Sequence, residues 1–318
     1  MKPADKEKAK DDQPGDSGDL DALLQQIYSR RGYDFREYKR ASLQRRIQKR
    51  LYENHLSTYQ EYMKLLGREP DEYAKLFDTL LINVSEFFRD PEAWEFIDDT
   101  VLPDILSRKL KGDSIRIWSA GCSTGEEAYS VAILIAEKLG DRIDDYNVRI
   151  YATDIDDGAL VEARKGIYAE NKVKNVPKGY LEKYFKDVDH ACQIRRNVRQ
   201  MIAFGRQDLI SDAPISHLDL IICRNVLIYF NTELQSRVVT KFNYALNSDG
   251  YVFFGKSESM LAGSLMFTPV NKKWRIFRKT GTAGPAMPAI KYKAETAIEE
   301  GRIEQAVCAA RKSMGDKP

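Results

Sequence analysis

The sequence predicts an α/β fold preceded by a small all-helical domain, and three observations support this prediction. From Ile115 onwards, short apolar strands alternate with amphipathic helices, a pattern typical of a mainly parallel sheet covered by helices on both faces. The first strand runs through a glycine-bearing loop directly into a helix. Between Leu20 and Ile82, by contrast, apolar residues recur at helical spacing throughout.

The N-terminal segment predicts a tail followed by a helical domain. Residues 1–19 mix Lys, Asp, Gly and Pro without apolar periodicity, which is typical of disorder. We therefore expect a disordered tail over 1–19 and a helical domain over 20–90, punctuated by glycines and a proline. Its apolar stripes contain Leu23, Leu24, Ile27 and Tyr28; Leu43, Ile47 and Leu51; Tyr59, Tyr62, Met63 and Leu66; and Tyr73, Leu76, Phe77, Leu80 and Leu81.

The second helix of this domain is strongly basic, and Glu37 is almost its only acid. Charge alone favours a solvated basic face. The alternative is a docking surface for an acidic partner, either a protein helix or a phosphate backbone. The cations are Arg36, Lys39, Arg40, Arg45, Arg46, Lys49 and Arg50.

The segment Asn83–Asp90 links this domain to the next one. Phe87 and Phe88 are most simply core residues. Arg89 follows them, and an arginine anchored in an apolar setting is well suited to hold a carboxylate by a bidentate contact.

The stretch Ile115–Ser130, IRIWSAGCSTGEEAYS, has the order strand, glycine loop, helix that brings backbone N–H groups up to a bound nucleotide. The loop lacks the lysine of a phosphate-binding P-loop, and Glu126 and Glu127 would repel a pyrophosphate. Asp154 ends the next strand, where a carboxylate typically accepts hydrogen bonds from ribose hydroxyls. A nucleoside with a cationic group suits these charges, and S-adenosylmethionine fits that description.

The remaining α/β elements follow in order. Strand Val148–Thr153 leads through Asp156 and Asp157, which we interpret as helix caps, into a helix. Between residues 167 and 204 the alternation breaks, and strand-like pieces Tyr184–Val188 and Gln193–Ile202 predict a small antiparallel insertion. The domain is predicted to span 91–280, and 281–318 reads as a linker with a loosely attached C-terminal helical tail. Its other elements are helices Glu126–Leu139, Gly158–Lys165 and Thr232–Leu246, and strands Leu218–Cys223, Tyr251–Gly255 and Trp274–Arg278.

A third group of polar residues follows the buried strand that ends at Cys223. Asn225 and Tyr229 lie just beyond it, at the carboxyl end of a parallel strand, where open α/β sheets bind ligands. Asn225 can hydrogen-bond a cofactor and Tyr229 can project into the site. The alternative is that both serve local backbone and core contacts.

Composition limits the class of protein. The chain has 318 residues and a nearly balanced net charge of +2, so the overall charge does not indicate a class of binding partner. Its four cysteines lie far apart without metal-ligand spacing, which predicts reduced thiols and no metal site. The N-terminus has no apolar signal core and no apolar run is long enough to span a bilayer. We expect a soluble, cytoplasmic protein.

Eight blocks, met in order from about Leu20 to Arg278, strongly resemble the chemotaxis receptor glutamate methyltransferases, the CheR family. The blocks are NVSEFFRD, RIWSAGCSTGEEAYSVA, YATDID, ARKGIY, the YF…F segment of the insertion, FGRQDL, DLIICRNVLIYF and GYVFFGKSES. The resemblance implies a Rossmann-like S-adenosylmethionine-dependent methyltransferase domain with a small antiparallel β-subdomain insertion, preceded by an all-helical N-terminal domain. It also implies methylation of receptor glutamates to methyl esters for chemotactic adaptation.

The resemblance implies roles for individual residues. Asn83, Ser85 and Arg89 match positions that contact the methionine end of the cofactor. Arg89 and Tyr229 match the pair that orients the reacting groups, and the basic helix matches the one that docks on the receptor's helical methylation region. The remaining cofactor contacts match Glu127, Asp154, Asp208, Leu209, Asn225 and Val226.

This chain departs from the family pattern in three places. Ser85 stands where Thr is usual, which keeps the hydroxyl. Asp208 stands where Asn is common, which puts its side-chain contact in doubt and leaves its backbone contacts possible. The turn Asp187–Ala191 is short for members that grip a C-terminal pentapeptide tether on the receptor, so we expect no tether.

Glutamate is already ionised at neutral pH, with an ordinary pKa of about 4.3, so its methylation needs positioning and exclusion of water but no general base. Two alternatives remain at this stage. A nucleic-acid methyltransferase would use the basic helix on phosphates, but the chain lacks the Asn-Pro-Pro-aromatic signature of amino-methylating enzymes. A non-catalytic adaptor would keep only the fold. We expect a monomer that binds neither nucleic acid nor the membrane interior.

Overall fold

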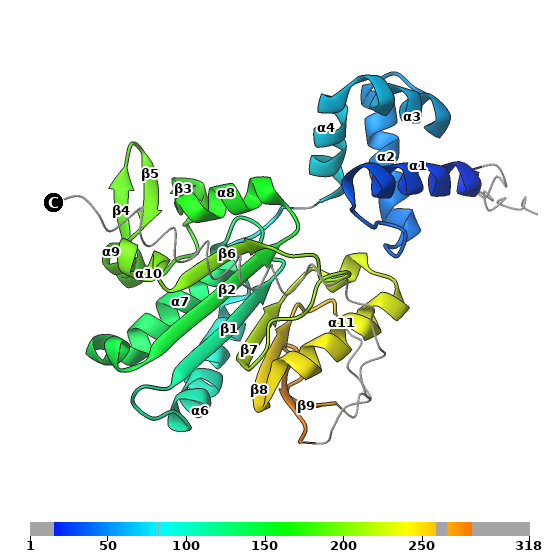
Figure 1. The fold of residues 1–318 in the computed structure, drawn as a ribbon. Helices are drawn as coiled ribbons and strands as arrows, with labels where there is room; N and C mark the ends of the chain where they lie inside the picture. Colours follow the sequence, from blue (N-terminus) through cyan, green and yellow to red (C-terminus); the bar gives the residue numbers. More distant parts are fainter. Residues whose placement is uncertain (1–15, 82, 259–265, 282–318) are drawn as a thin grey trace, which may run out of the picture. The chain divides into compact units, whose positions relative to one another are not determined.

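The computed structural model describes residues 16–81, 83–258 and 266–281. The chain divides into two compact units, with the boundary between residues 82 and 83 (Figure 1). The prediction placed the end of the helical domain at Asp90, but Phe87 and Phe88 lie in the core of the second unit. Their aromatic packing assigns the linker to that unit.

The first unit contains four helices around one apolar core. Twelve of the core's fourteen members belong to the predicted stripes, the other two being Leu20 and Phe35, and thirteen of the fourteen are at most 4% exposed. Tyr28 is an exception to the prediction, because it is 40% exposed and the Arg36 guanidinium lies 4.4 Å from the centre of its ring. The helices are α1 Asp16–Arg31, α2 Arg40–Glu53, α3 Tyr59–Arg68 and α4 Pro70–Leu80.

The second unit is built on a mainly parallel sheet of seven strands in the order β6-β2-β1-β7-β8-β10-β9 (Figure 1). Strands β6, β2, β1, β7 and β8 are parallel, and β10 is antiparallel to both of its neighbours. The strands are β1 Ser114–Ala120, β2 Asn147–Asp154, β6 Ile202–Arg206, β7 Leu218–Cys223, β8 Leu246–Phe254, β9 Phe267–Asn271 and β10 Ile276–Lys279.

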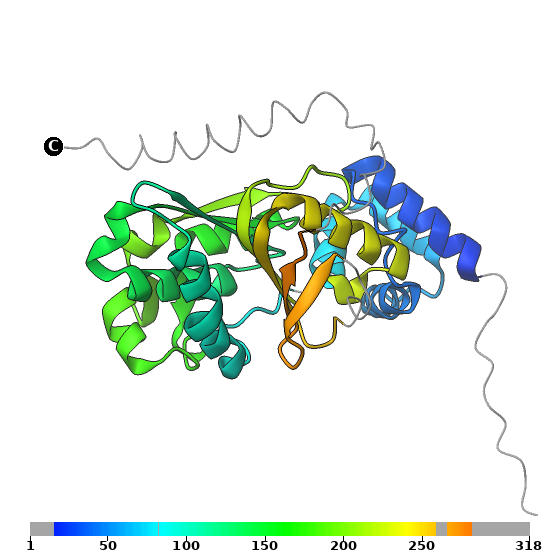
Figure 2. The ribbon, with the colours of Figure 1, turned by 90° about the horizontal axis from the view of Figure 1, so that it is seen from below.

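Helices cover both faces of this sheet, as predicted (Figures 1 and 2). Successive strand residues point to opposite faces. Ile117 faces the core that holds α5 Pro91–Phe96, α6 Leu102–Ser107 and α7 Glu126–Leu139. Trp118 instead packs edge-on against Phe242 of α11, Thr232–Ala245, at 5.4 Å between ring centres. A π-helical turn, Ile97–Val101, joins α5 to α6.

The predicted insertion is a separate three-stranded antiparallel sheet in the order β3-β5-β4, with β3 Ile167–Ala169, β4 Phe185–Val188 and β5 Ala191–Ile194. Asp189 and His190 join β4 to β5, with φ values of 44° and 62° typical of a two-residue hairpin turn. Phe87 of the linker packs against Tyr168 and Phe185 of this sheet at 4.8 and 5.5 Å. The neighbouring helices are α8 Asp157–Lys165, α9 Lys178–Tyr184 and α10 Arg196–Arg199.

Several strands differ from the prediction: β8 begins at Leu246 and not at Tyr251, and β3 was not predicted. Gln193–Ile202 is not one strand: it spans the end of β5, helix α10 and the start of β6. Strand β6 belongs to the large sheet, so the insertion ends before Ile202 and not at Phe204. Strand β9 was not predicted, because Phe267 is its only fully buried residue and its pattern does not alternate.

Helix α1 begins at Asp16, four residues before the first apolar residue, within the segment predicted as a tail. Apolar periodicity marks the buried part of a helix and not its polar first turn. Most of the predicted tail over 1–19, and the linker and C-terminal helix predicted from Thr282 onwards, lie outside the described residues. Among the residues described, no helix combines the length and apolarity needed to cross a membrane.

Candidate active site

The large sheet has its topological switch point between β1 and β7. After β1 the chain adds β2 and β6 on one side, and after β6 it crosses over to β7 and β8 on the other. In open α/β sheets the ligand crevice lies at the carboxyl ends of the strands at this point. The loops after β1, β2, β6, β7 and β8 meet at this edge, which we call the cofactor edge.

The loop after β1 approaches the loop after β7 closely. Gly121 has φ +73°, and a Cβ added to it would lie 2.4 Å from Cγ2 of Val226. Only glycine permits both this backbone conformation and this contact. Gly125, with φ +93°, stands at the N-cap of α7. The sequence analysis placed both glycines in this loop, and in the structure both have the positive φ that favours glycine.

Asp154 ends β2 and fastens the loop after β1. One carboxylate oxygen accepts a hydrogen bond from the backbone N–H of Ser123 at 2.7 Å, and the other accepts from Asp156 at 3.0 Å. Burial raises the pKa of the Asp154 carboxyl above its ordinary value, and these two backbone donors offset part of that effect. Asp156 caps α8 through the N–H groups of Gly158 and Ala159, as predicted.

Glu126 and Glu127 open α7, but they are not solvent-exposed acids of a helix terminus. Their exposed fractions are 0% and 7%. Burial raises the pKa of the Glu127 carboxyl, while Arg224 and Arg89 beside it act in the opposite direction. A buried acid without a partner is costly, so its counter-charges are part of the site.

Arg224 is the main counter-charge, and its side chain is 1% exposed. Its guanidinium donates to Oε1 of Glu127 at 2.7 Å, to Oδ2 of Asp90 at 2.5 Å and to the carbonyl of Arg89 at 3.0 Å. The same group lies 4.6 Å from the centre of the Phe253 ring. Arg224 therefore joins the loop after β7 to the start of α7 and to the linker.

Asp90 extends this network to the loop after β8. Its other oxygen lies 2.6 Å from Nζ of Lys256. Although burial opposes ionisation, Lys256 and Arg224 hold the pKa of Asp90 below its ordinary value. We call Glu127, Arg224, Asp90 and Lys256 the Arg224 network.

Glu258 joins the loops after β7 and β8. Its Oε1 accepts from the backbone N–H groups of Val226 and Leu227 at 2.9 and 2.8 Å, and Oε2 accepts from Gly255 at 2.5 Å. Asn225, the second residue of the loop after β7, has φ +61°. Burial raises the pKa of Glu258 from 4.5 to about 7, despite these backbone donors.

The two predicted catalytic residues lie at this edge in different settings. Arg89 is half-buried, and its guanidinium makes no hydrogen bond or salt bridge within the described chain, while its carbonyl accepts from Trp94 and Arg224. Tyr229 is half-buried in the 3-10 turn Leu227–Tyr229 after β7. Arg89 is thus a cation whose charge is still available to a ligand.

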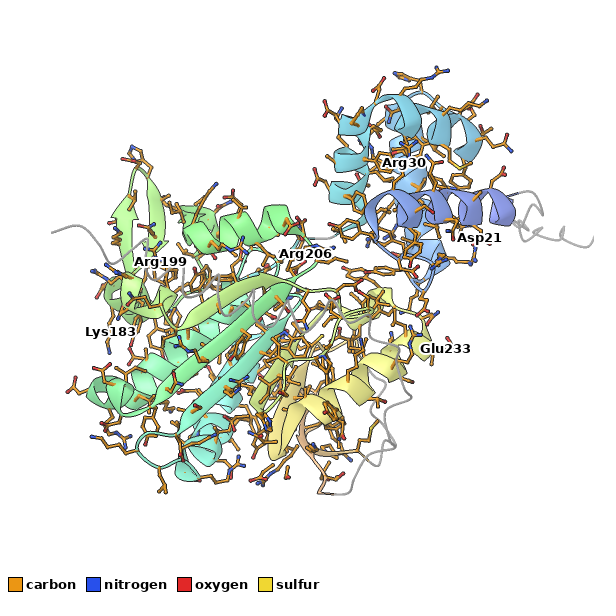
Figure 3. All side chains as sticks on the ribbon, viewed as in Figure 1. Asp21, Arg30, Lys183, Arg199, Arg206 and Glu233 are labelled. Carbon is orange, nitrogen blue, oxygen red and sulfur yellow. The ribbon has the colours of Figure 1, made fainter. Side chains whose placement is uncertain are left out.

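The other predicted cofactor residues divide into two groups. Ser85 is buried, and Asn83 is exposed and donates from Nδ2 to Oδ2 of Asp156 at 2.5 Å. In the loop after β6, the carboxylate of Asp208 already accepts from Ile210 N–H and Ser211 Oγ, and the Leu209 carbonyl accepts from Lys241. The side chain of Asp208 therefore makes hydrogen bonds within its own loop. Arg206, labelled in Figure 3, ends β6 opposite Asp154.

Backbone strain concentrates at the cofactor edge. Phe88, Asp90, Ser123 and Asn225 all have φ between 50° and 62°, and they are four of the nine non-glycine residues with positive φ in the described chain. Such conformations cost about 1–3 kcal/mol each and cluster at functional sites. Among the residues described, no group of acids, His or Cys has the arrangement of a metal site.

The seven predicted docking cations lie in the first unit, and four of them are engaged within it. Arg36 pairs with Asp34 and Arg40 with Asp21, which Figure 3 labels on α1. Arg46 donates to the carbonyl of Leu80.

Arg50 is structural. It forms a salt bridge of 2.6 Å with Glu72, whose side chain is 1% exposed and also accepts from Tyr62 and Asn54.

The other three cations are exposed and make at most one long contact. The side chains of Lys39 and Arg45 have no hydrogen bond or salt bridge within the described residues. Lys49 is 68% exposed and forms a salt bridge of 3.8 Å with Glu53. Arg45, Lys49 and Tyr52 share one face of α2, and Tyr52 is 82% exposed.

Sequence reasoning missed three residues that build the cofactor edge. Arg224 directly follows the strand that ends at Cys223, and no role was predicted for it, although a charge directly following six buried residues is itself a signal of a buried pair. Asp90 was interpreted as part of the linker. Glu258 lies in the block GYVFFGKSES, but no role was predicted for it, because a Ser-rich segment with one acid is ordinary in a loop.

Taken together, the switch-point edge, the glycine loop without a phosphate-binding lysine and the buried acids define a nucleoside-binding α/β protein for a cationic ligand. That is the class of the S-adenosylmethionine-dependent methyltransferases. Residues 83–276 match the family model described as CheR methyltransferase, SAM binding domain, and residues 18–81 match CheR methyltransferase, all-alpha domain. The chain belongs to the CheR methyltransferase family.

Named relatives agree with this family. The chain is 32% identical to the chemotaxis protein methyltransferase of Borreliella burgdorferi, over 76% of this chain and 88% of that protein. It is 34% identical to chemotaxis protein methyltransferase 2 of Vibrio cholerae, over 76% and 85%. A 104.1 kDa Rhodobacter capsulatus protein is 34% identical over 77% of this chain, which spans only 26% of that protein. The predicted family, fold class and S-adenosylmethionine cofactor are confirmed.

Proposed function

We propose that the protein transfers a methyl group from S-adenosylmethionine to glutamate side chains in the helical methylation region of chemotaxis receptors, giving glutamate methyl esters. The observation that carries this proposal is the pairing at the cofactor edge of an uncommitted cation, Arg89, with a buried acid, Glu127, that has one free oxygen. The ammonium group of the cofactor's amino acid end is complementary to Glu127. The carboxylate of that end, and the carboxylate of a substrate glutamate, both need a cation such as Arg89.

The residues present fit the cofactor. Asp154 suits the ribose hydroxyls, and Glu127 suits the ammonium, because its Oε2 makes no hydrogen bond within the described chain. Asn83, Ser85 and Arg89 suit the methionine end, and the chain near Asp208, Leu209, Asn225 and Val226 suits the nucleoside. When bound, S-adenosylmethionine supplies a methyl group on a cationic sulfur.

The chain's own groups position the reaction. A glutamate carboxylate is a nucleophile at neutral pH without a base, so alignment and exclusion of water provide the rate enhancement. Arg89 and Tyr229 orient the reacting groups in this proposal. Arg89 supplies a positive charge for a carboxylate, and it directly follows the buried residues Phe87 and Phe88, which anchor the backbone on that side.

Docking is assigned to the exposed cations of α2. Of the seven predicted residues, Lys39, Arg45 and Lys49 keep charge available for an acidic receptor helix, and the other four make contacts within the first unit. The charge complementarity is with protein carboxylates, which increases the encounter rate and sets specificity. We further propose a cytoplasmic monomer. We also propose that it uses no receptor tether, because the β4–β5 turn contains only two residues.

Transfer of labelled methyl from S-adenosylmethionine to receptor-enriched membranes tests the proposal. The product must be a receptor protein, and mild alkali must release the label, because carboxyl esters hydrolyse and N-methyl groups do not. Arg45→Glu combined with Lys49→Glu must reduce receptor labelling while leaving cofactor affinity unchanged. Alkali-stable label, or label on RNA or DNA, would refute the proposed substrate.

A further inference from the structure

Arg224 lies at the centre of the cofactor edge and has no assigned role in the proposed reaction. It is the most buried charged side chain of the Arg224 network. It contacts two acids, a carbonyl and an aromatic ring, and these partners come from the linker, α7 and β8. Burying a cation reduces the stability of the fold unless opposite charges and hydrogen bonds offset the loss of hydration.

The geometry at Glu127 shows what Arg224 contributes. Nη1 of Arg224 binds Oε1 of Glu127 and leaves Oε2 without a hydrogen bond in the described chain. The contact fixes the carboxylate group from one side and leaves the other side for a ligand. Loss of Arg224 would leave a buried acid near Arg89 alone, and a buried acid in that position takes up a proton more readily.

We propose that Arg224 is a positioning residue for the cofactor: it keeps Glu127 ionised and oriented, so that the free oxygen of Glu127 binds the ammonium group. This inference rests on the proposed role of Glu127 as a cofactor contact. Arg224 touches neither the cofactor nor the substrate in this proposal. Its effect reaches the ligand through Glu127.

The charged surroundings of Glu127 determine the sign of the pH effect. Arg224 from the loop after β7 and Arg89 from the linker favour its ionised form, whereas burial and Glu126 of α7 oppose it. The thiols of Cys122 and Cys223 lie nearby, and burial raises the pKa of both. An ammonium binds the ionised acid, so affinity falls as the pH decreases through the pKa of Glu127. Without Arg224 this fall must begin at a higher pH.

Calorimetric titration of S-adenosylhomocysteine into the full chain between about pH 5.5 and 8.5 tests the inference. The midpoint of the affinity loss is expected about 1–3 pH units higher in Arg224→Met than in the wild type, as for the loss of an opposite charge at hydrogen-bonding distance. Arg224→Lys keeps the charge and should stay within about one unit of the wild type. Arg108→Met, which removes a surface arginine paired with Asp104 and Asp249, is the matched control and should leave the midpoint unchanged.

A double variant separates positioning from a general structural role. In Glu127→Gln the affinity loss that comes from protonation of Glu127 should be absent, and adding Arg224→Met should cause no further shift of the pH profile. Methylthioadenosine, which has no ammonium group, should bind wild type and Arg224→Met with the same pH profile. If Arg224→Met does not fold, as judged by circular dichroism, the pH profiles of Arg224→Lys and Glu127→Gln still show whether the charge at position 224 acts on cofactor affinity through Glu127.

Two results overturn the inference. One is a loss of affinity by the same factor at every pH in Arg224→Met, and the other is a midpoint shift that survives in the Glu127→Gln background. Either leaves the proposed reaction standing, because wild type still binds the ligand. A wild-type chain that binds S-adenosylhomocysteine at no pH would instead overturn the proposed function.

Discussion

Glu258 gives the sharpest stability prediction, because burial raises the pKa of its carboxyl while its backbone hydrogen-bond donors lower it. Replacement by Gln keeps the size and one acceptor oxygen but removes the charge. The amide oxygen can still accept from Val226 and Leu227, whereas the amide nitrogen cannot accept from Gly255. That lost contact costs about 1–3 kcal/mol at every pH.

The pH-dependent part follows from linkage. Burial raises the pKa of Glu258 from 4.5 to about 7 in the folded chain. Between these values the folded state binds the proton and the unfolded state does not, so the wild type loses stability as the pH rises from 4.5 to 7. The difference between the two pKa values corresponds to about 3 kcal/mol. Glu258→Gln does not titrate and should lose none of it.

Tryptophan fluorescence can isolate the relevant unit. All three tryptophans of the chain, Trp94, Trp118 and Trp274, lie in the second unit. Urea unfolding followed by fluorescence between pH 5 and 8.5 therefore reports the unfolding free energy of that unit alone. We expect the advantage of the wild type over Glu258→Gln to shrink by about 3 kcal/mol across this range.

The matched control is Glu162→Gln, at a 55% exposed carboxylate on α8, for which the difference from wild type should stay constant with pH. A difference between wild type and Glu258→Gln that stays constant to about 1 kcal/mol would contradict the reasoning. It would mean that the three backbone donors, and not burial, determine the protonation of Glu258.

Three further predictions concern the site and the helical unit. Arg89→Ala and Tyr229→Phe should lower turnover more than cofactor affinity, measured by single-turnover transfer and calorimetry, and wild-type turnover in both would refute their roles. Gly121→Ala should raise the Kd for S-adenosylmethionine by about 5- to 30-fold, since φ +73° costs about 1–2 kcal/mol and the new Cβ meets Val226 at 2.4 Å; unchanged affinity in calorimetry would contradict the close approach. Arg50→Met should destabilise the first unit by about 3 kcal/mol by leaving a buried acid unpaired, and an unchanged far-UV circular dichroism melt would refute this.

The sequence allowed accurate prediction where burial imposes a period. Helix Glu126–Leu139 and strand Leu218–Cys223 have the predicted bounds, because one follows the helical period and the other is an apolar run interrupted only by Asp219. Strand β6 was missed because Ile202–Arg206 is half-buried at a sheet edge and does not alternate. Elements that lie at an edge leave a weak pattern because the core does not constrain them.

The partners of the site residues could not be predicted from the sequence. Glu127 and Arg224 are 97 positions apart, and only the meeting of α7 and the loop after β7 brings them together. Periodicity explained Glu127 as an acid at a helix N-terminus, where the macrodipole favours it. The structure shows that burial and a buried arginine, neither visible in local sequence, determine its state.

The strained residues at the cofactor edge have a common consequence. Phe88 and Asp90 flank Arg89 with φ of 50° and 62°, so the backbone on both sides of the proposed orienting cation is held in the left-handed region. Phe88 is held there by contact with Trp94 at 6.0 Å between ring centres, and Asp90 by its ion pair with Arg224. Since these contacts over-determine the backbone, Arg89 reaches the edge from a fixed position before a ligand arrives. A transfer that depends on alignment and not on proton removal gains most from this arrangement, because the ordering cost is met during folding.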